Sequence, residues 1–153
     1  MSYVLPQLAP GYAALAPWVE ALMRVIVALC LMPHGLRIAF GMFRNTGMPL
    51  DSTQGLAKAL DAQGFPPGAL WAPVIIVTEL IFAPMLALGL FTRLVSIPIF
   101  ILLALSIVAH IRDGWFWNTL GVEYPLVWSA GSLYFLVNGG GAISLDRLIG
   151  WEF

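Results

Sequence analysis

The sequence predicts an all-α integral membrane protein: a bundle of four transmembrane helices that forms a single domain over residues 1–153. Three observations predict this fold. Hydrophobic residues make up 60% of the chain and charged residues only 10%, whereas soluble domains carry about 25% charged residues. Connections after the second and third apolar stretches are short, which makes consecutive helices antiparallel neighbours. Four stretches approach the roughly 20 apolar residues that a span needs, at about residues 17–40, 69–91, 93–111 and 124–143.

The first predicted span, at about residues 17–40, carries more polar side chains than the other three. Glu20 and Arg24 have the i, i+4 spacing of an intrahelical ion pair. We interpret them as a structural pair that allows the arginine to lie within the apolar region. His34 and Arg37 lie near the far end of the same helix.

The segment between the first two spans, residues 41–68, is too polar to cross a membrane and too long for a tight turn. Within it, Leu56, Ala59 and Leu60 recur at helical spacing and form a short apolar stripe. We therefore predict a short amphipathic helix that lies at the membrane interface between spans one and two.

The second predicted span, at about residues 69–91, contains Glu79 near its middle and no other charged residue. At 1.5 Å per residue, this carboxyl lies about 15 Å from either end of the helix. A charge at the bilayer centre costs roughly 2.5–3.5 kcal/mol even on lenient insertion scales, so such residues usually face a bundle interior and have a function there. Pro84 also frees the carbonyl of Leu80 beside Glu79, which favours a bend or a pocket at this depth.

The third predicted span, at about residues 93–111, ends at His110, and the fourth, at about 124–143, opens at Tyr124 directly after Glu123. Because spans one and three end on the side where span four begins, their terminal polar residues gather at one end of the bundle. This end lies opposite the chain termini and above Glu79. The ionisable residues expected there are His34, Arg37, His110, Arg112, Asp113 and Glu123.

Charge and cysteine content exclude several functions. The net charge of −1 argues against nucleic acid as a partner. Cys30 is the only cysteine of the sequence, so a self-contained thiol–disulfide relay, which needs two, is excluded. The sequence has no nucleotide-binding glycine motif and no haem-attachment motif, and we assign no metal ligands. Redox chemistry by this chain would therefore need electrons from a partner protein or a reducing substrate.

At these positions the sequence resembles the DoxX family, a family of small bacterial membrane proteins with four spans. The matching pieces occur in order along nearly the whole chain: Pro33-His34-Gly35-Leu36-Arg37, Thr78-Glu79, Gly89-Leu90-Phe91-Thr92-Arg93, His110, Glu123-Tyr124-Pro125-Leu126, Gly139-Gly140-Gly141 and Ser144-Leu145-Asp146. The resemblance implies a multi-pass, four-helix protein of the bacterial inner membrane. It also implies membrane redox chemistry, because relatives include a quinone-reducing subunit of thiosulfate oxidation and partners in membrane oxidoreductase complexes. It assigns no catalytic residue.

We therefore predict a membrane subunit of a redox system, possessing a polar intramembrane pocket for a quinone or a similar lipophilic redox ligand. As a quinone-linked oxidoreductase subunit, it would use Glu79 to exchange protons and His34 and His110 to donate hydrogen bonds to the quinone carbonyls. Cationic side chains would stabilise developing negative charge. The residues expected to complete the ligand site are Arg37, Arg112, Glu123 and Tyr124.

Three alternatives remain open from the sequence. In the first, the chain is a non-enzymatic anchor or assembly subunit, and its buried polar residues form a structural hydrogen-bond network. In the second, His34 and His110 ligate a haem from two helices, or join Glu79 or Glu123 at a metal. In the third, Glu79 lies on a proton or ion path. Each alternative has the lipid bilayer as a partner, with a second membrane protein or a second copy of the chain beside it.

Overall fold

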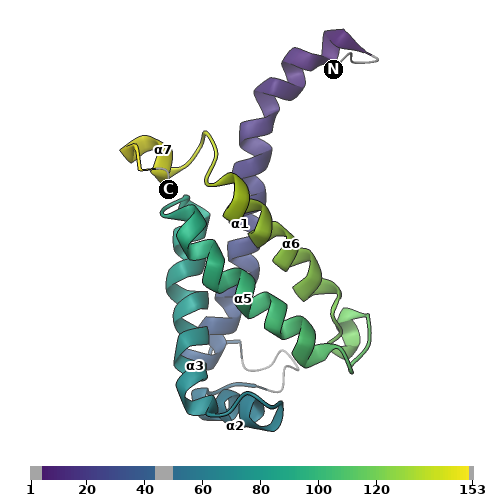
Figure 1. The fold of residues 1–153 in the computed structure, drawn as a ribbon, viewed down its shortest axis with the longest axis vertical. Helices are drawn as coiled ribbons and strands as arrows, with labels where there is room; N and C mark the ends of the chain where they lie inside the picture. The colour runs from purple at the N-terminus through teal and green to yellow at the C-terminus, as the bar shows by residue number, and fades with distance from the viewer. Residues whose placement is uncertain (1–4, 44–49, 152–153) are drawn as a thin grey trace.

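All regular structure is helical in the computed structural model, which describes residues 5–43 and 50–151 (Figure 1). This confirms the predicted all-α class. The elements in chain order are η1 (Pro6–Leu8), α1 (Ala9–Phe40), α2 (Thr53–Ala62), α3 (Gly68–Val77), η2 (Thr78–Phe82), α4 (Ala83–Leu88), α5 (Thr92–His110), η3 (Trp117–Thr119), α6 (Glu123–Asn138) and α7 (Leu145–Ile149).

Three helical stretches of the described residues are long and apolar enough to cross a membrane: Pro6–Phe40, Gly68–Leu88 and Thr92–His110. The second and third match the predicted spans to within three residues at each end. In Figure 1 the rod made by α3, η2 and α4 lies beside α1, and α5 and α6 pack against each other next to them.

Helix α1 begins at Ala9, before the predicted start of the first span near residue 17, and the point at which this helix enters a membrane stays a prediction. Pro10 occupies the first turn of α1. The N–H groups of a first turn have no partner within the helix, so the N–H that proline lacks is not needed there. The alanines that follow favour helix. As a result the first half of α1 extends beyond the other helices (Figure 1). The helix ends at Gly41, whose left-handed φ of 65° lets its N–H reach the carbonyl of Arg37.

The second span is a single rod with a wider turn in its middle. Residues Thr78–Phe82 form the π-helical segment η2, in which the Ala83 N–H donates to the carbonyl of Thr78, five residues earlier. Pro84 follows at the start of α4. Because proline has no N–H and its ring crowds the carbonyl four residues earlier, the regular pattern is interrupted on its N-terminal side. Glu79 therefore lies on a π-helical turn, and the predicted bend or pocket beside it stays a prediction.

The predicted fourth span is shorter than expected as a helix. Helix α6 has 16 residues, a length of about 24 Å. It ends at Gly139, which has φ of 79° and ψ of −161°, and residues 139–143 are not helical. The predicted helical end at 143 is therefore wrong, and the crossing of a membrane by this segment stays a prediction.

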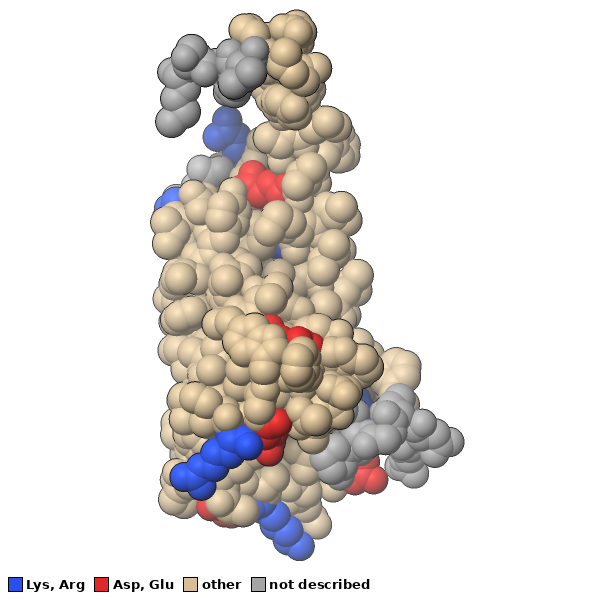
Figure 2. All heavy atoms as spheres, turned by 90° about the vertical axis from the view of Figure 1, so that its right-hand side faces the viewer, with Lys and Arg blue, Asp and Glu red and all other residues tan. Residues whose placement is uncertain are grey.

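The core lies where α1, α4, α5 and α6 meet. Its buried apolar side chains form one cluster, which consists of Val27, Ala28, Leu31, Ala83, Leu86, Val95, Ile99, Leu103 and Phe135. Large apolar side chains elsewhere on the same helices are exposed, as expected for a protein whose outer surface faces lipid. Figure 2 agrees with this, since uncharged atoms cover most of the face it shows and the charged side chains form small separate groups.

The predicted short helix between the first two spans is present as α2. Its Leu56 is buried against Ile38 of α1 and Ala72 of α3. The Asp61 carboxylate accepts a 2.7 Å hydrogen bond from the N–H of Gly68 and so caps the start of α3. The apolar stripe of α2 thus packs on the bundle, and the placement of this helix at the membrane interface stays a prediction.

Candidate functional site

Glu79 lies on η2 within the second membrane span and is only 7% exposed. Its Oε2 atom has no hydrogen-bond partner among residues 5–43 and 50–151. Buried polar atoms in proteins are nearly always paired, because removing them from water without a partner costs free energy. A buried carboxyl oxygen without a partner is therefore the feature of this span that most needs an explanation.

The neighbouring helix α1 approaches Glu79 closely at Gly35. A Cβ atom on Gly35 would lie 2.9 Å from the Cβ of Glu79 and 2.8 Å from the Cγ of Leu80. Glycine is thus the residue that allows these two helices to touch. This contact brings η2 beside the Pro33-His34-Gly35-Leu36-Arg37 motif and joins two of the predicted pieces of the site.

We predict that Gly35→Ala destabilises the protein by about 1–3 kcal/mol, the usual range for overpacking a close contact. The added methyl group must displace Glu79 or Leu80, which lie within 2.9 Å of it. The matched control is Gly11→Ala, where a Cβ meets nothing within 4 Å and the helix should gain stability. Thermal unfolding in detergent measures both variants, and equal unfolding temperatures would contradict the close contact.

The half-buried His34 of α1 contacts an aromatic side chain of another helix. Its ring lies edge-on to the Trp128 ring of α6, with centroids 6.4 Å apart and planes at 66°. Trp128 stacks on Tyr124 at 5.4 Å, and Tyr124 stacks on Trp117 at 6.1 Å. Sequence reasoning selected His34 and Tyr124 but missed Trp128. The i, i+4 spacing of Tyr124 and Trp128 on one helix was the available signal.

Arg37 lies one turn after His34 and is 5% exposed. Arg37 is thus a buried polar side chain near the same end of α1 as His34. Glu79, His34 and Arg37 therefore lie on the neighbouring elements η2 and α1, and His34 also contacts α6. Their action as one site stays a prediction.

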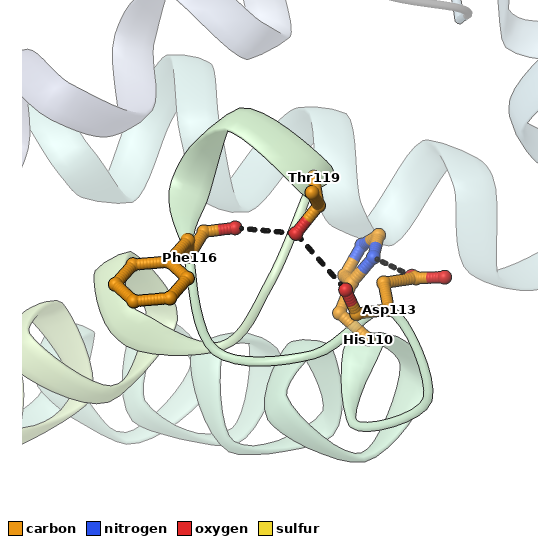
Figure 3. Close-up of polar contacts among 4 residues, drawn as sticks. All are labelled: His110, Asp113, Phe116 and Thr119. Atoms are coloured by element: carbon orange, nitrogen blue, oxygen red, sulfur yellow. Dashed lines mark hydrogen bonds and ion pairs between the residues drawn. The ribbon is translucent and has the colours of Figure 1, made fainter.

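The other predicted site residues belong to the connection between α5 and α6. The Nδ1 atom of His110 lies 3.0 Å from Oδ2 of Asp113 (Figure 3). The Oε1 atom of Glu123 accepts a 2.8 Å hydrogen bond from the backbone N–H of Trp117, and Arg112 is exposed. Within the described part of the chain, no hydrogen bond or ion pair joins this group to Glu79 or His34; the group consists of His110, Arg112, Asp113 and Glu123.

No group of three or more histidine, cysteine, aspartate or glutamate side chains that would suit a metal ion occurs in the described ranges. The packing of His34 on Trp128 and the pairing of His110 with Asp113 give each histidine a partner other than the second histidine. The haem and metal alternatives thus gain no support from the arrangement of side chains.

A second polar cluster lies at the opposite end of the bundle, around Arg24. This side chain is 3% exposed, and its Nε and Nη2 atoms donate to the carbonyls of Ala87, at 3.3 Å, and Ile143, at 2.7 Å. Its Nη1 atom donates to the carbonyl of Gly140. The arginine thereby satisfies two carbonyls of the non-helical segment that follows α6, whose backbone groups have no helical partners.

The predicted Glu20–Arg24 pair takes a different form in the structure. Glu20 and Asp146 attract the Arg24 guanidinium electrostatically, but its hydrogen bonds go to carbonyls. Glu20 instead accepts a 3.1 Å hydrogen bond from the hydroxyl of Tyr134 on α6. A structural role is retained, because both residues tie α1 to the C-terminal third of the chain.

Asp146 completes this cluster. Its carboxylate accepts hydrogen bonds of 2.6 and 2.8 Å from the N–H groups of Phe91 and Thr92, and its own N–H donates to the carbonyl of Gly89 at 2.8 Å. It therefore caps the N-terminus of α5 from a distant part of the chain. The local sequence around α5 contains no sign of this cap.

A family model described as DoxX matches residues 19–112, more than half of the chain, from α1 through α5. The matched region includes Arg24, His34, Glu79 and His110 and ends before α6. Neither the curated proteins nor the solved structures contain a match.

Proposed function

Because this chain belongs to the DoxX family of membrane proteins, we propose that it is a membrane subunit of a redox system and binds a quinone or a similar lipophilic redox ligand between α1, η2 and α6. The observation that carries the proposal is the Oε2 atom of Glu79, which is buried without a partner in the described residues. A ligand with a carbonyl or hydroxyl group would supply the missing hydrogen bond.

A quinone fits the chemistry of these residues. Its reduction adds two electrons and two protons to the two carbonyl oxygens and yields a quinol. A protonated Glu79 donates a hydrogen bond to a quinone carbonyl, and an ionised one accepts from a quinol hydroxyl. His34 is a donor or an acceptor according to its tautomer. These two side chains are thus the proton-exchanging groups of the proposal, and Arg37 favours developing negative charge.

The electrons must come from outside this chain. Its one cysteine, Cys30, and the absence of nucleotide and haem motifs from its sequence leave no internal electron carrier. We therefore assign the chain a partner redox protein, or a reducing substrate, in the bacterial inner membrane where quinones dissolve. In this assignment His110, Arg112, Glu123 and Tyr124 lie toward the membrane surface and remain predicted ligand contacts.

Mass spectrometry of bound quinone tests the proposal. The protein is purified in mild detergent, extracted, and its quinone is quantified against protein and against the lipid background. We expect near-stoichiometric quinone in the wild type and in Asp51→Asn, a control at an exposed carboxylate. At least tenfold less is expected in Glu79→Leu.

Absence of quinone above background in all three proteins would refute the redox-ligand proposal. It would favour the anchor or assembly role, which the Arg24 cluster supports because its polar groups are paired with backbone. A Soret band in the purified protein would instead establish the haem alternative.

A further inference from the structure

The outward face of α5 carries a continuous apolar stripe. Its side chains are 43–60% exposed, recur every three or four residues along the helix, and are Leu94, Ile97, Ile101, Leu105 and Val108. This spacing places them on one side of the helix. Since α5 is long and apolar enough to cross a membrane, this stripe has the composition of a surface that contacts lipid.

The connection that leads from α5 to α6 also exposes large apolar side chains. Ile111 is the first of these, and it is followed by Trp115, Phe116 and Trp117, which are 55–64% exposed. We call residues 113–122 the aromatic loop. Three consecutive large aromatic side chains with this exposure are unusual on a surface that only contacts water, even though one face of the Trp117 ring stacks on Tyr124.

The aromatic loop is held in one shape by its own hydrogen bonds. The N–H groups of Val122 and Glu123 each donate at 3.1 Å, to the carbonyls of Gly114 and Trp115. The Thr119 hydroxyl lies 2.9 Å from the carbonyl of Phe116 and 3.0 Å from that of Asp113 (Figure 3).

The side chains of His110 and Glu123 reinforce this arrangement. The His110 ring pairs with the carboxylate of Asp113, the first residue of the loop (Figure 3). The Glu123 carboxylate accepts a hydrogen bond from the N–H of Trp117. The backbone that carries the three exposed aromatic side chains therefore has a defined shape before it meets any partner.

The backbone of the loop is also strained at its tip. Leu120 adopts a left-handed φ of 63°, which costs a residue with a side chain about 1 kcal/mol or more. The next residue must be glycine, because a Cβ on Gly121 would lie 2.6 Å from the carbonyl oxygens of Gly114 and Trp115. Strain and close packing of this kind persist where the shape of a loop matters.

We infer that the aromatic loop is a preformed membrane-interface anchor, which inserts Trp115, Phe116 and Trp117 into the headgroup–acyl boundary of a phospholipid bilayer. Lipid is the partner that the neighbouring helix favours, because the loop directly follows α5, which is apolar enough to cross a membrane and exposes an apolar stripe. Tryptophan favours this boundary because its ring is apolar and its N–H is polar. Arg112, exposed at the base of the loop, can reach lipid phosphates from there.

Spin labels report the depth of the loop. The label is placed at Phe116→Cys in a Cys30→Ala background, in vesicles of phosphatidylethanolamine and phosphatidylglycerol. Phe116 is suitable because only its backbone carbonyl takes part in the loop hydrogen bonds. Collisions with oxygen, which enters lipid, are compared with collisions with a water-soluble nickel chelate. The reference labels are Val108→Cys on the stripe and a free label in water.

The inference expects the Phe116 label to collide with oxygen almost as often as the Val108 label, and with nickel several-fold less often than a free label in water. Nickel access equal to that of the free label would place the loop in water and overturn the inference. Poor access to both reagents would place it against a protein and overturn it as well. Thr119→Val should keep the same helical content by circular dichroism but increase the mobility of the Phe116 label, because both hydroxyl contacts are lost.

Discussion

Glu79→Leu is expected to raise the thermal stability of the ligand-free protein in detergent while abolishing its response to added quinone. The wild-type carboxyl is 7% exposed, and its Oε2 atom is without a partner in the described residues. Replacing such a group by an apolar side chain of similar size removes a desolvation cost of about 1–3 kcal/mol. Functional sites commonly carry this kind of destabilisation, and its removal stabilises a protein at the expense of activity.

Unfolding temperature, measured with and without a short-chain quinone, tests this prediction. The wild type should unfold at a higher temperature when quinone is added, because a ligand that binds only the folded state stabilises it. Glu79→Leu should unfold at a higher temperature than the wild type without quinone, and added quinone should not change its unfolding temperature. A lower unfolding temperature for Glu79→Leu without ligand would show that the carboxyl stabilises the fold, as the anchor alternative requires.

Arg24→Met is expected to destabilise the protein by about 3 kcal/mol or more, because removing a buried arginine leaves its partners unpaired. The guanidinium donates to three carbonyls, those of Ala87, Gly140 and Ile143. Methionine preserves most of the apolar stem and none of the donors. The loss should fall on the segment after α6, which depends on this side chain for two of its carbonyls.

Denaturation in mixed detergent micelles, together with proteolysis of the C-terminal region, measures the effect. The matched control is Lys58→Ala, which removes an exposed basic side chain on α2 and should change stability by about 0.5 kcal/mol or less. Quinone content should follow the folded fraction in Arg24→Met, because this residue lies at the opposite end of the bundle from the proposed site. If Arg24→Met unfolds under the same conditions as the control, the hydrogen bonds of Arg24 do not stabilise the fold and the prediction is wrong.

The candidate site was predictable where a local anomaly marked it. Glu79 interrupts an apolar stretch, and Pro84 stands five residues later, so a perturbed polar position in the second span followed from the sequence. The partners of this position were not predictable. The approach of Gly35 and the contact between His34 and Trp128 join residues of different helices, and their meeting depends on how the helices pack.

Sequence alone determined the all-α class, the membrane character and the positions of the second and third spans. These properties are local, because a helix in lipid pairs its backbone within itself and its limits follow the apolar stretch. Only the tertiary structure decided that α6 ends at Asn138 and that the following turn is held by Arg24. It also decided that Asp146 caps α5 and that His110 and Glu123 hold the aromatic loop. These partners lie in other elements, and which of them a buried polar group finds is decided by packing.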